Sequence, residues 1–549
     1  MTRVWGALAA LALLGATACS PAQTARPAPP AHSVTPTPVP LATAIKQAAK
    51  LGPSGMATHV DLSLGLKVRQ GDELARLVAS GRTVTPEEYV MRFGPDPIRV
   101  KAAVEVLTSN GLKAATWRPG SALIAAGGPA PAVAAMFAID IEDYQLPSGA
   151  TFYASLDTPK LAPVLAAVIT SVNGLDSYRH ERTYAVRPGG LTPTDVLAFY
   201  NLKPLRDAGL DGAGITVVLP EIDDLPNLTD LNKFAAEFGL PPYDPLLTLK
   251  RDTSWGTPEK PQGETTLDLE IIHQVAPAAK MVVYFSAPDF AHADRAFDQM
   301  VSDHLGSVIS ESLGACESDT PSGHRDQYAS IQNRSAAQGM SHFVASGDGG
   351  AYTCGVAAAP ATSFPATLPN VTAVGGTTVF ESVQGVYFKE VAWGAPLAEG
   401  GSGGGASQFY AVPDYQKVVS QAAGHALRQV PDVAANADPS TGFHIVFGGH
   451  EGQAGGTSAA APLWAATVAL IDQDLKRKGL RETGFANPAI YWMGANASRL
   501  PARPFHDVTG GNNLAFDAMP GWDFATGWGS MDGAALDAAW ITYIKGGGA

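Results

Sequence analysis

The pattern of hydrophobic and polar residues changes along the chain near residue 185. Before that point, short alternating segments mix with amphipathic ones; His59 to Leu64, for example, alternates polar and apolar residues as a half-buried strand does. We expect further strands at residues 122–125, 139–144 and 151–153, and helices at 72–79, 97–110 and 131–137. This part of the chain therefore predicts a compact α+β domain, and it contains no catalytic constellation.

After Leu191, apolar runs are nearly continuous almost to the end of the chain. They occupy residues 215–219, 281–285, 308–309, 343–345 and 371–374, and helical stretches separate several of them. Strands that are buried on both faces and alternate with helices predict a parallel α/β sheet. Glycine-rich loops such as 400–405 are expected at the edges of this sheet.

The first 45 residues predict an export signal and a tether. Residues 1–19 combine Arg3 with an apolar run that is too short to span a bilayer, followed by small residues. The segment resembles a bacterial lipoprotein signal with Cys19 as the lipidated residue; ordinary cleavage after Ala18 is the alternative. Residues 20–45 are rich in proline, alanine and threonine, which favours an extended linker. We therefore expect a protein outside the cytoplasm, secreted or lipid-anchored at the cell envelope.

Composition narrows the function classes. Apolar residues make up 46% of the 549 residues and charged ones only 16%, so most of the chain should be globular. The net charge of −14 and the absence of a Lys/Arg run argue against a nucleic-acid partner. An acidic surface that is poor in lysine also loses its excess charge as the pH falls, which is compatible with work in acid.

The stretch from Gly455 to Pro462 places Ser458 after two glycines and a threonine, where an alanine-rich apolar segment begins. In one interpretation this serine is a plain cap of a buried helix. In the other it is a nucleophile, because the free N–H groups and the positive dipole end of a helix stabilise developing negative charge. The stretch alone leaves both interpretations open.

Three carboxylates bear on this choice. Glu264 and Asp268 open a predicted helix that stops at Pro277, and their i, i+4 spacing brings them close enough to share a proton. The alternative is a solvated acidic face, which is weakened because the segment leads directly into the buried strand 281–285. Asp348 follows another buried strand, where ligands of parallel sheets bind, although Asp-Gly-Gly there is also typical of a simple turn.

Together these motifs resemble the sedolisin family of serine-carboxyl peptidases, in its kumamolisin group. The resemblance covers roughly residues 55 to 545 and rests on Glu264-x-x-x-Asp268, Ser346-Gly347-Asp348, Gly456-Thr457-Ser458-Ala459, His506-Asp507-Val508-Thr509 and Gly521-Trp522-Asp523 with the residues up to Gly529. It implies a subtilisin-like, doubly wound parallel α/β catalytic domain at 190–545. A smaller α+β, ferredoxin-like activation prodomain would precede it at 46–185. The basic segment 177–182 between them is either a plain linker or the place where a processing cut would release the catalytic domain.

The resemblance implies a role for each catalytic residue. Ser458 would be the nucleophile that forms an acyl-enzyme, Glu264 its general base and acid, and Asp268 the partner of Glu264. Asp348 would donate a hydrogen bond to the oxyanion. A histidine base with an ordinary pKa of about 6.5 would be cationic in acid, whereas a carboxylate near 4 is still partly ionised. We therefore predict an acid endopeptidase with an optimum around pH 3 to 5, made as a zymogen inhibited by its own prodomain.

Two rival interpretations remain. Ordinary subtilisins share the Gly-Thr-Ser-Ala signature but use a histidine in an HGTHVAG-like stretch, where this chain reads Gly263-Glu264-Thr265-Thr266. His273 lacks that setting, and we expect it on the helix surface. The other rival is a catalytically silent binding module on a peptidase fold, although the four catalytic groups and the prodomain argue against it.

The resemblance also implies one Ca²⁺ site near the C-terminus. Asp507 and Asp523 would supply carboxylate oxygens, and Val508, Met519 and Gly521 backbone carbonyls. Met519 stands where relatives commonly have glycine, but a carbonyl can come from any residue.

Several residues near the expected cleft bear on substrate binding. By the resemblance, Ser312 to Gly314 form the strand edge on which protein or peptide substrates lie. Leu313 stands near a tryptophan position of the family's outer hydrogen-bond network, so that part is not carried over. Ser363 replaces an aspartate that can select a basic substrate residue, so no preference for arginine is implied. Glu221 is a further candidate for the proton network.

With Cys19 lipidated or removed, Cys316 and Cys354 remain as a pair. Both follow strands that border the expected active site, and an exported protein can oxidise them. We predict a disulfide at the rim of the cleft, in a protein that acts as a monomer.

Overall fold

The computed structural model describes residues 41–114, 117–147, 149, 151–178, 186–187, 189–355, 359–381, 387–394, 400–419 and 424–546. The predicted signal with Cys19, most of the predicted linker and most of the predicted processing segment lie outside the described residues. Within the described part of the chain, no helix combines the length and the apolar character that crossing a membrane requires.

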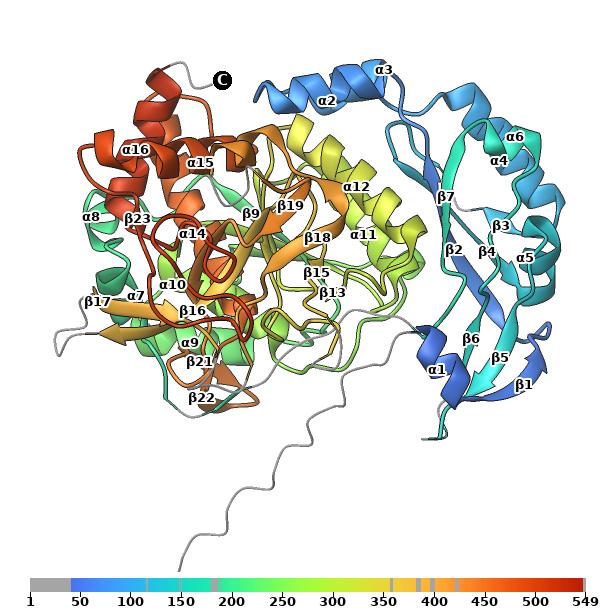
Figure 1. Ribbon diagram of the computed structural model, residues 1–549, viewed down its shortest axis with the longest axis horizontal. Helices are drawn as coiled ribbons and strands as arrows, with labels where there is room; N and C mark the ends of the chain where they lie inside the picture. The colour runs from blue at the N-terminus through green and yellow to red at the C-terminus, as the bar shows by residue number, and fades with distance from the viewer. Residues whose placement is uncertain are drawn as a thin grey trace, which may run out of the picture. The chain divides into compact units, whose positions relative to one another are not determined.

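The N-terminal domain is built on a four-stranded antiparallel sheet in the order β3-β4-β2-β7 (Figure 1). Its main elements are β2 (His59–Leu66), α4 (Pro97–Ser109), β3 (Lys113–Ala114), β4 (Leu123–Pro129), α5 (Ala130–Phe137) and β7 (Ile169–Asn173). A βαββαβ chain order with its first and last strands adjacent is the ferredoxin-like arrangement, as predicted. The short helices are α2 (Gly71–Ala79), α3 (Pro86–Arg92) and α6 (Pro163–Ala166).

A smaller sheet, β1-β5-β6, completes this domain; its strands are β1 (Ala49–Pro53), β5 (Glu142–Gln145) and β6 (Thr151–Ala154). Helix α1 (Leu41–Gln47) packs on it, and Leu41 is buried against Tyr144 and Phe152. The end of the segment that was expected to be an extended tether is therefore helical, because it carries apolar residues that this sheet covers.

The C-terminal domain is organised around an eight-stranded sheet in the order β10-β11-β9-β12-β14-β16-β17, with β20 beside β16. All pairs are parallel except β16 with β17. The strands are β9 (Thr216–Glu221), β10 (Leu247–Lys250), β11 (Lys280–Phe285), β12 (Val308–Glu311), β14 (Ser341–Ala345), β16 (Thr372–Glu381), β17 (Tyr387–Ala392) and β20 (Val433–Asn436). The strand order reverses between β9 and β12, which is the switch point where ligands of doubly wound sheets bind.

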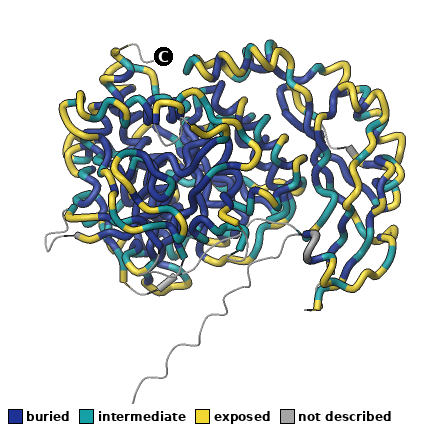
Figure 2. Tube along the Cα trace, in the orientation of Figure 1, coloured by how far each residue is buried: buried dark blue, intermediate teal, exposed yellow. Residues whose placement is uncertain are grey.

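Helices cover both faces of this sheet. Helices α10 (Glu264–Val275) and α14 (Thr457–Arg477) share one apolar core with Val217 and Leu219 of β9, whereas α11 (Phe290–Asp303) and α12 (Ser322–Ala337) share another with Val218. Alternate residues of one strand thus face opposite layers. Figure 2 shows buried positions concentrated in the middle of this domain. The parallel α/β sheet predicted from the continuous apolar runs is confirmed.

Smaller elements surround this core. The helices are α7 (Pro193–Phe199), α8 (Lys203–Asp207), α9 (Thr229–Phe238), α15 (Asn487–Ala495) and α16 (Gly533–Lys545). The strands are β8 (Val186–Arg187), β13 (Ala315–Cys316), β15 (Ser363–Phe364), β18 (Gly405–Ala411), β19 (Leu427–Val430), β21 (Phe443–Phe447), β22 (His450–Ala454), β23 (Phe505–His506) and β24 (Ser530–Met531).

The glycine-rich segment 400–405 is mostly buried against the loop that follows β14, at the carboxyl end of this strand. Gly403 N donates to Gly347 O at 2.7 Å, and Ser346 Oγ donates to Gly403 O at 2.7 Å. A Cβ atom on Gly403 would lie 1.9 Å from Ser346 O, so only glycine fits this approach. The segment therefore fixes the loop that carries Asp348.

The two domains meet through two carboxylates of α11. Asn173 Nδ2 donates to Asp294 Oδ2 at 3.0 Å, and Ser121 Oγ donates to Asp298 Oδ2 at 2.7 Å. Between these carboxylates Arg295 donates to Leu62 O at 2.9 Å and to a second carbonyl of the N-terminal sheet. The sheet of the N-terminal domain is thus held on the face of α11.

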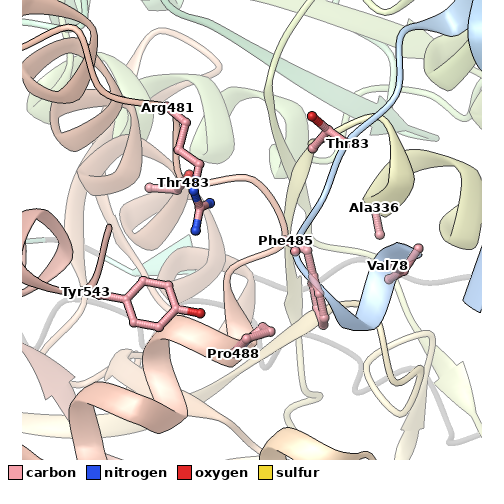
Figure 3. A pocket seen from close by; sticks show the side chains of 9 residues that line it. Val78, Thr83, Ala336, Arg481, Thr483, Phe485, Pro488 and Tyr543 are labelled. Atoms are coloured by element: carbon pink, nitrogen blue, oxygen red, sulfur yellow. The ribbon is translucent and has the colours of Figure 1, made fainter. Parts of the chain in front are cut away.

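Helix α2 makes a second contact with the C-terminal domain. Figure 3 shows Val78 beside Ala336 and Phe485 at a small pocket, which Arg481 and Tyr543 also line. Apolar residues of α2 and α3 share a buried cluster with Ala336, which extends the contact beyond the polar one on α11.

Candidate active site

Ser458 is the second residue of α14 and is only 1% exposed. Gly456 precedes the helix with a φ of 102°, which favours glycine, and a Cβ atom there would lie 2.6 Å from Asp348 Oδ2. Ser458 Oγ lies 3.3 Å from Ser312 O, to which it donates. Ser458 is not the cap of this helix, because the N-cap residue is Gly456. The tight glycine turn therefore brings the serine and Asp348 to the same place.

Helix α10 carries Glu264 as its first residue and Asp268 one turn later, as predicted. Every residue of α10 is buried, so the alternative of a solvated acidic face is wrong. Asp223 fixes the start of the helix, because its carboxylate accepts from Gln262 N at 2.6 Å and from Gly263 N at 2.9 Å. The two carboxyl groups are thereby held in the protein interior.

Ser312, directly after β12, joins α10 to α14. Its Oγ lies 2.9 Å and 2.7 Å from the two carboxylate oxygens of Asp268 and 3.0 Å from Ser458 O. The hydroxyl thus orients Asp268 against the backbone of the serine. The sequence identified Ser312 only as part of a substrate-binding edge, and this side-chain role was missed.

A third buried carboxyl, Glu221 at the end of β9, belongs to the same cluster. Thr265 Oγ1 donates to Glu221 Oε2 at 3.2 Å, and Glu221 also hydrogen-bonds Asp268. Burial raises the pKa of Asp268 to about 8, a rise that hydrogen bonds from Ser312 and Glu221 oppose. Burial, together with the charges of Asp268 and Glu264, raises the pKa of Glu221 well above its usual range. The cluster therefore retains protons at pH values where exposed carboxyls are ionised.

Asp348 follows β14 and faces the start of α14. Its Oδ1 accepts from Thr457 N at 2.7 Å and from Thr457 Oγ1 at 2.7 Å. Burial raises the pKa of Asp348 to about 6, and the two hydrogen bonds from Thr457 oppose this rise. Below about pH 6 the group is mainly neutral and can donate a hydrogen bond. Asp348 is half-buried, and its two hydrogen bonds from Thr457 join it to the start of α14, which a simple turn would not require.

His273 was expected on the helix surface, but it is fully buried near the C-terminal end of α10. Its ring packs on Tyr243 with centroids 4.2 Å apart, and Nε2 lies 2.7 Å from Pro241 O. Burial lowers its pKa to about 4. His273 comes nine residues after Glu264, about 13.5 Å farther along the helix axis. Its ring nitrogen is hydrogen-bonded to Pro241 O, which argues against a role as the base of Ser458.

The predicted disulfide between Cys316 and Cys354 is confirmed. It joins β13 to the loop that follows Asp348, and β13 pairs with β15, which contains Ser363. Ser363 is buried and its Oγ lies 3.3 Å from Ala315 O. The disulfide thus connects the segment after Ser312 with the segment after Asp348.

The predicted calcium ligands lie on one irregular loop. Gly521 N donates to both carboxylate oxygens of Asp507 at 3.1 Å, and Met519 N donates to Asp523 Oδ2 at 2.9 Å. Asp523 is buried and Asp507 is exposed, while Val508 is buried beside them. Two carboxylates therefore face the 519–521 segment, and a donor set made only of oxygens suits a hard cation such as Ca²⁺.

The fold and these groups define a class: a subtilisin-like α/β protein in which a serine at the start of a buried helix is linked through Ser312 to a buried carboxyl group. Comparison with known proteins narrows it. The model of the pro-kumamolisin activation domain matches residues 46–178, and that of the subtilase family matches residues 256–529.

Full-length relatives extend the match. Sedolisin of Pseudomonas sp. (strain 101) is 31% identical over 90% of this chain and 88% of its own length. Kumamolisin of Bacillus sp. (strain MN-32) is 30% identical over 89% of this chain and 93% of its own length. The structure of Pseudomonas sedolisin, a serine-carboxyl proteinase in complex with pseudo-iodotyrostatin, covers 66% of this chain and 100% of its own with a TM-score of 0.58 and 32% identity. The chain belongs to the sedolisin family.

It is accordingly a serine-carboxyl peptidase with an N-terminal activation domain, and so a zymogen. This finding excludes the silent binding module. Family membership also decides between the two kinds of peptidase that share the Gly-Thr-Ser-Ala motif. A peptidase of the histidine-based kind would need a histidine base on α10, and α10 offers no candidate for it.

Proposed function

We propose that the protein is an exported acid endopeptidase that cleaves peptide bonds through an acyl-enzyme on Ser458. The observation that carries this proposal is the link from Asp268 through Ser312 Oγ to Ser458 within a buried carboxyl cluster. The histidine of α10 is hydrogen-bonded elsewhere. Carboxyl groups are thus the titratable side chains at hand for proton transfer.

In this proposal Glu264 is the general base and acid. Ser458 Oγ attacks the carbonyl carbon of the substrate while Glu264 takes the hydroxyl proton, and the protonated Glu264 then gives this proton to the leaving amine. Water hydrolyses the acyl-enzyme by the same steps in reverse. Asp268 and Glu221 hold further protons beside Glu264, and their hydrogen bonds adjust how readily it accepts and returns the proton.

Asp348 supplies the oxyanion donor. The oxyanion that forms during attack needs preorganised donors, and a neutral carboxyl at the N-terminus of α14 provides one. Because burial raises the pKa of Asp348 to about 6, this donor is present below that pH and is lost as the pH rises through it. The same pH range leaves a general base of ordinary carboxyl pKa partly ionised.

The calcium proposal concerns stability rather than the reaction. One Ca²⁺ would be held by Asp507, Asp523 and the carbonyls of Val508, Met519 and Gly521. When bound, the ion neutralises two carboxylates and fixes the C-terminal loop. The convergence of both carboxylates on residues 519–521 supports this set.

The remaining parts of the proposal concern the export of the protein and its inhibition before processing. Residues 1–19 would direct export, with lipidation of Cys19 or cleavage after Ala18, and a cut in 177–182 would release the catalytic domain as a monomer. The contacts of Asp294 and Asp298 with the N-terminal domain support an intramolecular inhibitor. Strand β8 pairs with β22, three residues before Thr457, which brings the segment between the domains near the serine.

The test is hydrolysis of a protein substrate between about pH 2 and 8 by wild type, Ser458→Ala, Glu264→Gln and Asp348→Asn. We expect an acidic optimum in wild type and loss of activity in Ser458→Ala. Full activity of Ser458→Ala, or a neutral optimum that survives Glu264→Gln, would overturn the proposal. Mass spectrometry of the mature N-terminus identifies the processing site and any lipid.

A further inference from the structure

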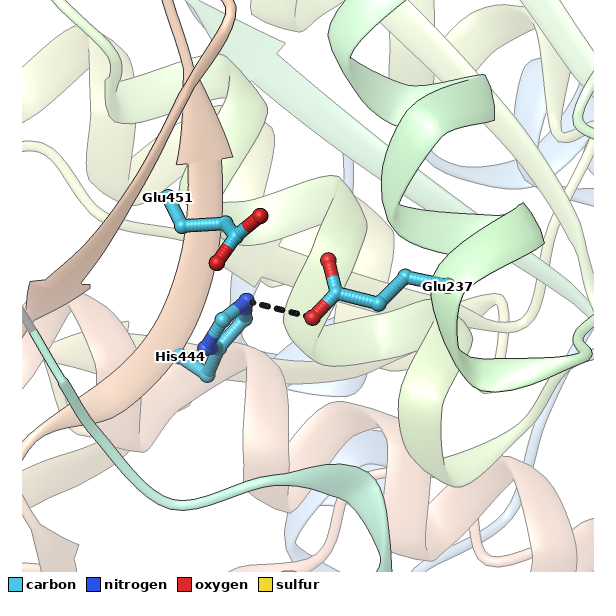
Figure 4. A group of neighbouring side chains, drawn as sticks. All are labelled: Glu237, His444 and Glu451. Atoms are coloured by element: carbon cyan, nitrogen blue, oxygen red, sulfur yellow. Dashed lines mark ion pairs between the residues drawn. The ribbon is translucent and has the colours of Figure 1, made fainter.

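Away from the proposed active site, three metal-ligating side chains converge from three elements. Glu237 comes from α9, His444 from β21 and Glu451 from β22. One ligand atom of each lies within 4.8 Å of the other two, and Figure 4 shows the side chains pointing toward one another. The proposed mechanism and the calcium loop use none of them.

The geometry of His444 leaves room for an ion. Its Nε2 lies 3.5 Å from Glu237 Oε1, which is too long for a good hydrogen bond. This nitrogen is sheltered from solvent and has no hydrogen-bond partner among the described residues. Phe238 holds the ring in place, since the two rings pack edge to face with centroids 5.1 Å apart. The nitrogen is thus fixed toward the carboxylates without a direct bond to them.

The 3.5 Å separation between His444 Nε2 and Glu237 Oε1 matches a known coordination geometry, and all three ligand atoms lie within 4.8 Å of one another. A tetrahedral zinc ion with bonds of about 2.0–2.2 Å separates its ligand atoms by roughly 3.3–3.5 Å. An imidazole nitrogen with two carboxylate oxygens is a donor set typical of zinc and related divalent metals, and the nitrogen disfavours Ca²⁺ and Mg²⁺. We propose that Glu237, His444 and Glu451 bind one divalent transition-metal ion of the zinc class, with water as the remaining ligand.

A lysine limits the affinity of this site. Lys233 Nζ lies 3.7 Å from Glu451 Oε1 and donates to Gly449 O at 3.0 Å. Its ammonium competes with a metal ion for Glu451, so the ion has to displace it. The Gly449 carbonyl still provides Lys233 with a partner after that displacement. Removal of this charge should therefore strengthen metal binding.

The metal would stabilise the segment that leads to the serine. The β21–β22 hairpin continues through Gly455 and Gly456 into α14, and it pairs with β8 from the segment between the domains. An ion shared by α9 and both strands of the hairpin would tie this hairpin to the rest of the domain. The site thus has a structural role that is separate from peptide hydrolysis.

The test uses the full chain with Ser458→Ala, which prevents self-cleavage, and it is independent of the proposed catalytic mechanism. Zn²⁺ binding is measured by titration calorimetry at about pH 7.5, with excess Ca²⁺ to fill any calcium site. We expect one Zn²⁺ per chain. His444→Gln and Glu237→Gln should each weaken binding at least about tenfold.

Two further variants sharpen this test. Lys233→Gln should strengthen Zn²⁺ binding roughly two- to fivefold. His59→Gln is the matched control, because His59 Nε2 also lies near a carboxylate, 3.8 Å from Asp61, but is exposed and belongs to no group of three metal-ligating side chains among the described residues. It should bind Zn²⁺ as the parent does. No bound Zn²⁺, equal binding by His444→Gln, or weaker binding by Lys233→Gln would each overturn the proposal.

Discussion

Two buried helices of the catalytic domain each carry a pair of carboxylates at i and i+4, and they use them differently. On α10, Asp268 contacts hydroxyl and carboxyl groups, and burial raises its pKa to about 8. On α11, Asp294 lies 2.8 Å from His324, and Asp298 lies 2.9 Å from the guanidinium of Arg334. The spacing is the same, but the printed partners differ: Ser312 and Glu221 contact Asp268 on α10, whereas His324 and Arg334 contact the pair on α11.

This difference separates proton transfer from docking. Burial raises the pKa of Asp294 as well, and its contacts with His324 and Asn173 oppose this rise. Asn173 and Ser121 of the activation domain donate to the carboxylates of α11. Asp268 of α10 is instead linked through Ser312 to the backbone of Ser458. The different partners, rather than the spacing along the helix, thus separate the two pairs.

The largest expected effect is on kcat, and it distinguishes a change of a carboxyl group on α10 from the matched change on α11. Glu264→Gln should lower kcat of the mature enzyme by roughly 10³–10⁴, because it removes the proposed base. Asp294→Asn, the matched change on α11, should leave kcat of the mature enzyme within a few-fold of wild type. Equal losses in the two variants, measured by steady-state kinetics at the optimum, would remove the distinction between the helices.

Asp348 offers the next largest effect. Asp348→Ala should lower kcat by roughly 10²–10³ through loss of an oxyanion donor. Asp348→Asn keeps an N–H donor at every pH, so it should lose less and its activity should no longer fall as the pH rises through about 6, the pKa that burial gives Asp348. Identical pH–rate profiles for the Asn variant and wild type would contradict this role.

Ser312 should have a smaller effect. Ser312→Ala removes the hydroxyl between Asp268 and Ser458, and since that hydrogen bond lowers the pKa of Asp268, its loss should raise this pKa further. We expect kcat to fall about tenfold with little change in KM, together with a shifted pH profile.

Ser310→Ala is the matched control for this change. Ser310 lies on the same strand and is buried, but its hydroxyl has no hydrogen-bond partner among the described residues. Its removal should leave the profile unchanged. If both variants shift the profile equally, the effect belongs to the strand and not to the link with Asp268.

The smallest effects concern the contact with the activation domain. Asn173→Ala and Ser121→Ala each remove one hydrogen bond to a carboxylate of α11, so the mature enzyme should appear a few-fold to tenfold faster in acid. Ser109→Ala, an exposed serine of the same domain, should change nothing. The rate is read from a time course of processing, and slower processing of Asn173→Ala would contradict the docking role.

The fold class could be predicted from the sequence because the apolar runs alone indicate the buried strands. The continuous runs of β9, β11 and β14 predict strands buried on both faces, and they are so in the structure. Local patterns failed where tertiary contacts decide. The glycines at 400–405 fit a surface loop as well as a buried one, and the apolar residues of α1 find their partners only in the folded domain.

The site was predictable only in part, for the same reason. Glu264 and Asp268 lie close in sequence, so their pairing can be read from the spacing. Ser312 is 44 residues from Asp268 and 146 from Ser458, so no local pattern joins them. Nor does spacing distinguish α10 from α11, because the basic partners of Asp294 and Asp298 come from α12. The family resemblance supplied that choice.

The central claim is that carboxyl groups, and not a histidine, supply the base and the oxyanion donor. The most direct test is the pH dependence of kcat/KM for the mature wild-type enzyme on an uncharged peptide. If carboxyl groups have these roles, we expect a bell-shaped profile with an optimum around pH 3 to 5. We also expect a descending limb near pH 6, where Asp348 loses its proton. A rate that rises through about pH 6.5 to a neutral plateau, as a histidine base would give, would contradict this claim.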